Sequence, residues 1–215
     1  MLITYQGHSQ FLLESAQGLR VLTDPYDQSA RFPVAEVAAD VVTVSHNHGD
    51  HNYIKKVQGS PMVISTAGVH TLPGGASAEA FPAFHDEVEG SKRGSNLLFK
   101  IHLDGLTIAH LGDLGHPLNA QQVDFLQGTH ILLVPVGGFY TIDAPQAKAL
   151  IDKVGPRITI PMHYKTPEGG LHNIAPVEDF LALMVPRTAS RQPLLRVTKE
   201  DLSQQPNLVV LKVQG

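Results

Sequence analysis

The sequence predicts an α/β fold in which two β-sheets pack face to face with helices on the outside, within a single domain spanning residues 1–215. Short β-type runs separated by Gly, Pro, Asn and Asp fill the first half. A hairpin signal, a continuous apolar run and an amphipathic helix follow in the second half. Strands that are apolar on both sides need cover on both faces, which favours packed sheets with outer helices.

The first half contains six candidate strands, each a run of apolar or β-branched residues that ends at a turn residue. They are expected at residues 2–5, 11–14, 20–23, 41–45, 62–65 and 80–84. Residues 53–57 are compatible with a short helix that has Asp50 near its start.

The second half begins with "FKIHLDGLTIAH", in which Asp104-Gly105 suits a tight turn between two antiparallel strands. The apolar run "HILLVPVGG" indicates a strand buried on both faces. In "DAPQAKALIDKVGP", Asp143 is the expected N-cap of a helix that Gly155 and Pro156 end. A strand is expected at 157–163, a helix at 176–184, and closing strands at 194–198 and 208–213.

Composition excludes several classes of site and partner. The chain has no cysteine, so any metal is held by nitrogen and oxygen atoms. The net charge of −4, with scattered basic residues, argues against nucleic acid as a partner. No apolar run approaches the roughly 20 residues that cross a bilayer, and the N-terminus does not resemble a signal peptide. We expect a cytoplasmic protein with a small-molecule substrate and no membrane partner, and a homo-oligomer remains open.

Residues 46–51, "HNHGDH", carry the main chemical signal, directly after a predicted strand. Residues two apart on an extended chain project to the same side, so His46 and His48 can chelate one ion. Gly49 permits a change of direction, after which Asp50 and His51 point to a neighbouring position where a second ion fits. Clustered His and Asp at this spacing predict a metal centre with two cations.

This H-x-H-x-D-H pattern resembles the signature of the metallo-β-lactamase superfamily. Further motifs follow in the same order: "PAFHDE" with His85, "AHLGDLGH" with Asp113 and "IPMHYKT" with His163. The segments "GHSQFLLE", "LTDPY" and "VPVGG" resemble a branch of small intracellular Zn-dependent hydrolases that includes L-ascorbate-6-phosphate lactonase. The resemblance extends from about residue 5 to residue 167.

The resemblance implies an αββα four-layer sandwich of two mixed sheets flanked by helices, with a dinuclear site at one edge. It also implies the metal ligands. His46, His48 and His85 would bind one cation, Asp50, His51 and His163 the other, and Asp113 would bridge. Zn²⁺ is the favoured metal, and Mn²⁺, Fe²⁺ or Ni²⁺ suit the same donors.

Several other residues beside these motifs are candidates. Asp50 is the expected catalytic residue, because it can orient a hydroxide or relay its proton. His110 competes with His85 for the first cation, and we expect His110 to pack nearby instead. Asp24 is expected to fix loops or to orient a ligand imidazole. The expected substrate contacts are His8, Arg93, Asn96, His116, Tyr140 and Tyr164.

Two cations about 3.5–4 Å apart lower the pKa of a bound water towards 7 and supply hydroxide as a nucleophile. The sequence therefore predicts a metal-dependent hydrolase that cleaves an ester, lactone or phosphodiester bond of a small anionic substrate. The alternative function is a non-catalytic, metal-stabilised sensor or subunit domain. A structural site closes its coordination shell, whereas this ligand set leaves positions for water, which favours the enzyme.

Overall fold

A computed structural model describes residues 1–214 of the chain, and two six-stranded sheets form its centre. The first sheet has the order β15-β1-β2-β3-β5-β7. Its strands, in chain order, are β1 Leu2–Gly7, β2 Gln10–Glu14, β3 Arg20–Thr23, β5 Val41–Thr43, β7 Met62–Ile64 and β15 Leu195–Arg196. The second sheet has the order β13-β12-β11-β10-β9-β8. Its strands are β8 Gly68–Thr71, β9 Ser77–Phe84, β10 Ser95–Leu103, β11 Leu106–His110, β12 Ile131–Pro135 and β13 Ile158–Met162.

Both sheets are mixed and have the same plan. In the first, β15, β1, β2 and β3 pair antiparallel, while β3, β5 and β7 run parallel. In the second, β8, β9, β10 and β11 pair antiparallel, while β11, β12 and β13 run parallel. The carboxyl ends of parallel neighbours meet at one edge of a sheet, and that edge carries the loops after β5, β11 and β13.

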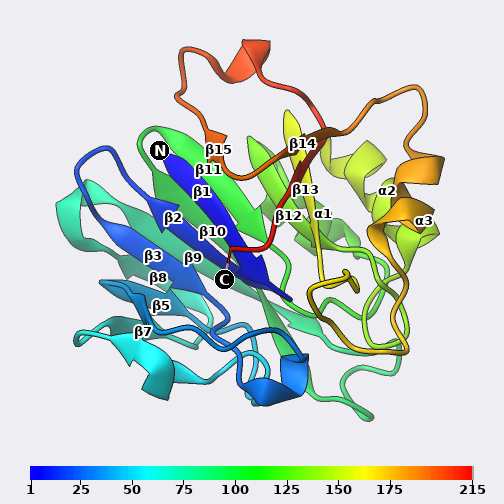
Figure 1. Cartoon of the computed structure of the whole chain (residues 1–215), viewed down its shortest axis with the longest axis horizontal. Helices are drawn as coiled ribbons and strands as arrows, with labels where there is room; N and C mark the ends of the chain where they lie inside the picture. The colour runs from blue at the N-terminus through cyan, green and yellow to red at the C-terminus, as the bar shows by residue number, and fades with distance from the viewer. Residues whose placement is uncertain (215) are drawn as a thin grey trace.

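The main core lies between the two sheets, which are seen one in front of the other in Figure 1. Alternate residues of the first sheet enter it, among them Ile3, Tyr5 and Val21, because successive side chains of a strand face opposite ways. Leu22 and Val42, one position further along, belong instead to a second cluster on the outer face. Both faces of the first sheet are therefore packed, as the sequence predicted.

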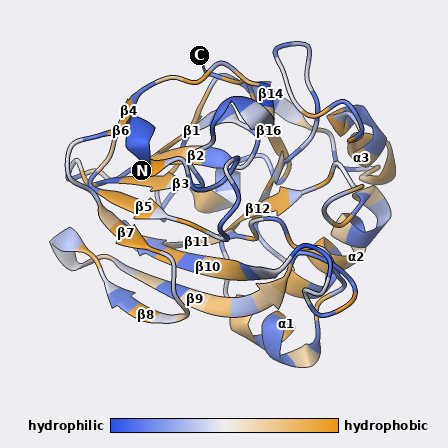
Figure 2. Cartoon of the chain, turned by 90° about the horizontal axis from the view of Figure 1, so that it is seen from below, coloured by the Kyte–Doolittle hydropathy of each residue, from blue (hydrophilic) through white to orange (hydrophobic). Residues whose placement is uncertain are grey.

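The outer layers differ between the two sheets. The helices α1 (Ala120–Leu126), α2 (Ala144–Val154) and α3 (Val177–Leu183) lie beside the second sheet (Figures 1 and 2). On the first sheet, the outer cluster is completed by Ile54 of the 3-10 turn η2 (Ile54–Lys56) and by Val37 and Val57 of the strand pair β4 (Val37–Ala38) and β6 (Val57–Gln58). The predicted sandwich of two mixed sheets is confirmed.

Most expected elements are present. β3 has its predicted bounds, and α2 begins after the N-cap Asp143 and ends at Gly155 in a left-handed conformation, as expected. Residues 53–57 form only the short η2 turn. Among residues 1–214, no helix is long and apolar enough to cross a membrane. Near the end of the chain, β14 (Ser190–Gln192) and β16 (Val209–Leu211) form a small two-stranded sheet.

Candidate metal centre

Five loops at one edge of the sandwich bring the candidate ligands together. They carry His8 after β1, residues 45–51 after β5, His85 after β9, Asp113 after β11, and His163 after β13. Each side chain therefore follows a strand whose position the sheets fix, which is how side chains far apart in sequence converge.

The Asp113 carboxylate lies at the centre of this cluster. Its Oδ2 atom is 3.2 Å from His51 Nε2 and 3.3 Å from the Nε2 atoms of both His85 and His163. It is also 4.0 Å from His46 Nε2. One oxygen thus contacts members of both predicted ligand sets, which is the position expected of a bridging carboxylate.

The first predicted set is compact. The ligand atoms of His46, His48 and His85 all lie within 4.8 Å of one another. In the other set, Asp50 Oδ2 is 4.0 Å from His51 Nε2, and its side chain is 22% exposed, so that it borders the open side of the cluster. His110 lies outside both sets: its Nε2 contacts the Ser9 carbonyl oxygen at 2.8 Å, as expected of a residue that packs nearby.

Asp24 fixes the loop that carries the ligand histidines. Its Oδ2 atom accepts hydrogen bonds from His51 Nδ1 at 2.8 Å and Ser45 Oγ at 2.6 Å, and Oδ1 accepts one from the Ser45 N–H. This contact leaves His51 Nε2 as the free nitrogen facing Asp113. Ser45 Oγ also lies 2.9 Å from His46 Nδ1, a contact that the sequence analysis missed although Ser45 directly precedes the motif.

Three buried or half-buried carboxylates of the cluster, Asp24, Asp50 and Asp113, form ion pairs with histidine. Burial raises the pKa of Asp113, but the imidazoles of His163 and His51 outweigh it and hold that pKa well below its usual range. Burial likewise raises the pKa of Asp24 and Asp50, and contacts with His51 and His8 respectively lower both pKa values overall. Within residues 1–214, the ion pairs recorded for these three carboxylates are all with histidine.

The donor atoms fit divalent cations. Among the described residues, His46 Nε2, His163 Nε2 and Asp113 Oδ1 are buried and have no hydrogen-bond partner. Burial lowers the pKa of His46 to about 3, so this imidazole is neutral at pH 7 and can offer a lone pair. A bound cation would satisfy these unpartnered ligand atoms and would neutralise the ionised, buried carboxylates beside them.

Asp113 is held by its own neighbours. Its N–H donates to Asn96 Oδ1 at 3.0 Å, while Asn96 Nδ2 donates to the Leu111 carbonyl oxygen at 2.9 Å. Gly112 has a φ of +52°, and a Cβ there would stand 2.4 Å from Asn96 Oδ1. Only glycine permits this approach, so Asn96 and Gly112 together set the position of Asp113.

A pocket of about 320 Å³ opens beside the cluster. Its wall combines candidate ligands with other side chains, two of them from further loops after β3 and β12: Ser29, His48, Asp50, His85, Arg93, Asp113, Tyr140, His163 and Leu171. Of the expected substrate contacts, Arg93 and Tyr140 line this pocket, with the guanidinium carbon 5.4 Å from the centre of the phenol ring. Ser29 and Leu171 were not expected, because neither belongs to a recognisable motif.

The loop 86–94 that carries Arg93 is organised by one carboxylate. Asp86 accepts four backbone hydrogen bonds, from Val88, Gly90, Lys92 and Arg93, at 2.7–2.9 Å. Burial raises the pKa of Asp86, but these N–H groups lower it to about 2. The loop over the pocket is therefore an ordered turn with Arg93 held beside Tyr140.

Four of the expected substrate contacts do not line this pocket. Tyr164 is 2% exposed and packs in the core beside Tyr5, and Asn96 is fully buried with both amide atoms bonded. His116 has both ring nitrogens on backbone groups, Nε2 accepting from the Phe84 N–H and Nδ1 facing the Pro117 carbonyl oxygen. His8 is fully buried beneath the cluster and does not line the pocket. Motif neighbours were expected at the pocket, but strand alternation and turn geometry direct these side chains inward.

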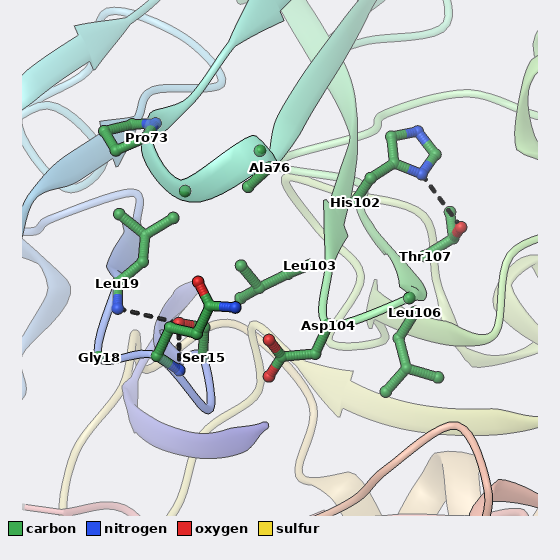
Figure 3. A pocket seen from close by; sticks show the side chains of 14 residues that line it. Ser15, Gly18, Leu19, Pro73, Ala76, His102, Leu103, Asp104, Leu106 and Thr107 are labelled. Atoms are coloured by element: carbon green, nitrogen blue, oxygen red, sulfur yellow. Dashed lines mark hydrogen bonds between the residues drawn. The ribbon is translucent and has the colours of Figure 1, made fainter.

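The largest pocket lies at the opposite ends of the strands, where the turns after β2 and β10 meet the 3-10 turn η3 (Pro73–Gly75) (Figure 3). Its polar groups are already paired: His102 Nδ1 lies 3.2 Å from Thr107 Oγ1, and Asp104 accepts from the Ala16 N–H. None of the groups of His and Asp side chains that could hold a metal ion, within residues 1–214, lies in this pocket. The smaller pocket beside Asp113 is therefore the candidate site.

Residues 2–163 match the family described as the β-lactamase superfamily domain, and the chain belongs to the metallo-β-lactamase superfamily. A relative named UPF0173 metal-dependent hydrolase, from Carboxydothermus hydrogenoformans, is 31% identical over 77% of this chain and 85% of its own length. A crystal structure from Thermotoga maritima, described as a proposed Zn-dependent hydrolase of the superfamily, has a TM-score of 0.81 with 37% identity and covers 99% of both chains.

A second solved structure, an isothiocyanate hydrolase from Delia radicum gut bacteria, has a TM-score of 0.70 with 14% identity. It covers 100% of this chain and 98% of its own, and at this identity it supports the fold alone. The relatives and the donor cluster together support a metal-dependent hydrolase.

Proposed function

We propose that the chain is a two-metal hydrolase that cleaves an ester, lactone or phosphodiester bond of a small anionic molecule, with Zn²⁺ as its metal. The observation that carries this proposal is the position of Asp113 Oδ2, which is 3.2 Å from His51 Nε2 and 3.3 Å from His85 Nε2 and His163 Nε2. A carboxylate oxygen shared between two groups of imidazoles is suited to two neighbouring cations.

Bound cations would supply Lewis acidity and a lowered pKa for water at the site. His46, His48 and His85 would hold one cation, and Asp50, His51 and His163 the other, with Asp113 between them. Nitrogen-rich donors suit Zn²⁺, which the name of the Thermotoga maritima relative also specifies. Mn²⁺, Fe²⁺ and Ni²⁺ can use the same donors.

Asp50 is the residue we assign to proton handling. Its carboxylate borders the pocket and stays ionised, because contacts with His8 and His51 outweigh the burial that would raise its pKa. An ionised carboxylate here accepts a hydrogen bond from the attacking water and so orients the oxygen of that water toward the substrate.

The pocket favours a small substrate with one negative charge. Its volume of about 320 Å³ is at the lower end of small-molecule sites. Arg93 offers a guanidinium that can pair with a carboxylate or phosphate group, while Tyr140 and Leu171 offer apolar surface. Ester, lactone and phosphodiester substrates require the same contacts from the pocket. In each of them an electrophilic carbon or phosphorus atom carries an anionic or polarised oxygen.

Hydrolysis assays with and without metal test the proposal. Purified protein would be assayed on bis(p-nitrophenyl) phosphate and on a panel of lactones, then after chelation, then after re-addition of Zn²⁺. We expect hydrolysis of at least one substrate, its loss on chelation and its return with metal. Metal that stabilises the fold while every substrate remains intact would instead support the metal-stabilised sensor or subunit.

A further inference from the structure

The turn between β1 and β2 holds a histidine in a strained conformation. His8 has a φ of +54°, a left-handed backbone conformation that costs free energy in residues other than glycine. Four hydrogen bonds hold this turn. The His8 carbonyl oxygen accepts from Tyr5 Oη at 2.9 Å and from the His163 N–H at 2.8 Å. The Ser9 carbonyl oxygen accepts from Thr23 Oγ1 at 3.0 Å and from His110 Nε2 at 2.8 Å.

This conformation directs the His8 side chain into the donor cluster. The side chain is fully buried, and its Nε2 atom is 3.1 Å from His51 Nε2 and 3.3 Å from Asp50 Oδ2. The ring centre lies 4.4 Å from that of His163. The ligand atoms of His8, His51 and His163 all lie within 4.8 Å of one another, as compact a group as His46, His48 and His85.

The spacing of these atoms matches ligands of one ion. Zinc–nitrogen bonds of about 2.0–2.1 Å at tetrahedral angles place neighbouring donor atoms about 3.3 Å apart. The 3.1 Å between His8 and His51, and the 3.2 and 3.3 Å from Asp113 Oδ2 to His51 and His163, are close to that edge length. Two imidazole nitrogens in direct contact have one hydrogen at most to share, and a cation between them satisfies both lone pairs.

We propose that His8 is a metal ligand, whose Nε2 joins His51, His163 and Asp113 around the second cation. This inference rests on the two-metal function proposed above. It gives each cation three imidazoles, and it explains why the chain keeps a strained histidine under the site. Asp50 Oδ2, 3.3 Å from His8 Nε2, lies beside the same position and borders the pocket.

Substitution of His8 tests the assignment. His8→Asn and His8→Gly are suitable variants, because Asn and Gly accept a left-handed conformation most readily. His102→Asn is the control, since His102 lies at the opposite ends of the strands, where its Nε2 contacts Glu79 Oε1 at 2.7 Å. Each protein would be stripped of metal, checked for folding by circular dichroism, and titrated with Co²⁺ while visible absorption is recorded.

We expect the unaltered chain and His102→Asn to bind two equivalents of Co²⁺. Both His8 variants should bind the second equivalent more than about 100-fold more weakly, beyond the 10–100-fold that loss of a ligand's hydrogen-bonded partner costs. The absorption of the second cobalt should also change. A second equivalent that binds within that 100-fold, with unchanged absorption in both variants, would show that His8 is not a ligand.

The same titration separates this inference from the proposed function. If the unaltered chain binds a single Co²⁺, the two-metal function fails. His8 is then supported only if its replacement changes the absorption of that one ion, and it is overturned if the absorption stays the same.

Discussion

At the scale of single residues, the candidate metal centre depends on side chains outside the two proposed ligand sets. Asp24 is the clearest case, because its carboxylate accepts from His51 Nδ1 at 2.8 Å and from both Ser45 Oγ and the Ser45 N–H. The residue fixes which nitrogen of His51 faces Asp113, and it orients the backbone that leads into the histidine motif.

Replacement of Asp24 by Asn should therefore weaken metal binding while leaving every direct ligand in place. We expect a 10–100-fold loss of affinity, typical of a ligand's hydrogen-bonded partner, measured by competition with a chromophoric chelator. Asp40→Asn is the control, because Asp40 is a surface carboxylate paired with Arg20. Equal metal affinity in the Asp24→Asn and Asp40→Asn variants would show that Asp24 does not support the metal centre.

Arg93 is the residue that we expect to select a charged substrate. A hydrogen bond to a charged group contributes about 1.5–3 kcal/mol, so Arg93→Met should raise KM for an anionic substrate by roughly 10- to 150-fold. The kcat should change much less. Lys92→Met is the matched control, since Lys92 is an exposed neighbour on the same loop that does not line the pocket. A similar KM rise for a neutral lactone would contradict a charge-specific role.

At the scale of elements, the loop 86–94 is the part of the structure that shapes the pocket wall. Asp86 is its organising residue, with four backbone N–H groups on one carboxylate. In Asp86→Asn the side chain has one acceptor oxygen in place of two, so about half of these hydrogen bonds should be lost.

We expect Asp86→Asn to raise KM for anionic substrates, as Arg93→Met does, and to speed hydrogen exchange of the loop amides. Both metals should remain bound. Glu89→Gln serves as control, because Glu89 is exposed on the same loop. Unchanged amide exchange in Asp86→Asn would show that the loop is ordered by other contacts.

The elements that the sequence predicted well are those with two independent signals. α2 combines an apolar stripe with Asp143 at its start and Gly155 at its end, and the structure confirms all three. The helix α1 was missed because its seven residues bury only Gln122 and Leu126 and so lack an apolar stripe. Its available signal was the pair Asn119 and Gln122, which forms a capping box. The edge strand β8 was missed because its side chains are mostly exposed, with Val69 77% exposed.

The residues of the candidate site also differ in how far the sequence alone could predict them. Ligand candidates could be placed from sequence because metal chemistry restricts residue type and spacing, whereas substrate contacts have no such restriction. Whether Asn96 or Tyr164 faces the pocket depends on strand alternation and turn geometry that only the three-dimensional fold determines. His8 shows the limit most clearly, since a positive φ and four hydrogen bonds, three of them to residues far away in the sequence, direct its ring to the candidate ligands.

At the scale of the whole molecule, Tyr26 is a buried polar side chain that links the loop after β3 to β1. Tyr26 is 2% exposed, and its Oη donates to the Gln6 and Pro33 carbonyl oxygens at 2.6 and 3.0 Å. Burial raises the pKa of Tyr26 to about 12. The unfolded chain therefore releases this proton near pH 10 while the folded chain retains it.

This difference predicts a loss of stability at high pH. The free energy of unfolding should fall as the pH rises from about 10 to about 12, by up to about 2 kcal/mol from this one residue. Urea titrations across that range would measure the fall. Tyr26→Phe should be less stable at pH 8 but should lose less stability above pH 10. An equally steep fall in the variant would assign the pH dependence to other groups.

The whole fold also explains the placement of the centre. Two sheets with the same plan each end their parallel strands at one edge, so that β5 supplies His46, His48 and His51 while β11 and β13 supply Asp113 and His163. The central claim is that this edge holds two cations with the Asp113 carboxylate between them.

Anomalous X-ray diffraction at the zinc absorption edge, from crystals grown with Zn²⁺, tests that claim most directly. We predict two anomalous peaks about 3.5–4 Å apart on either side of Asp113 Oδ2, one next to His46, His48 and His85 and the other next to His51 and His163. A single peak, or peaks outside this group of side chains, would contradict the two-metal account.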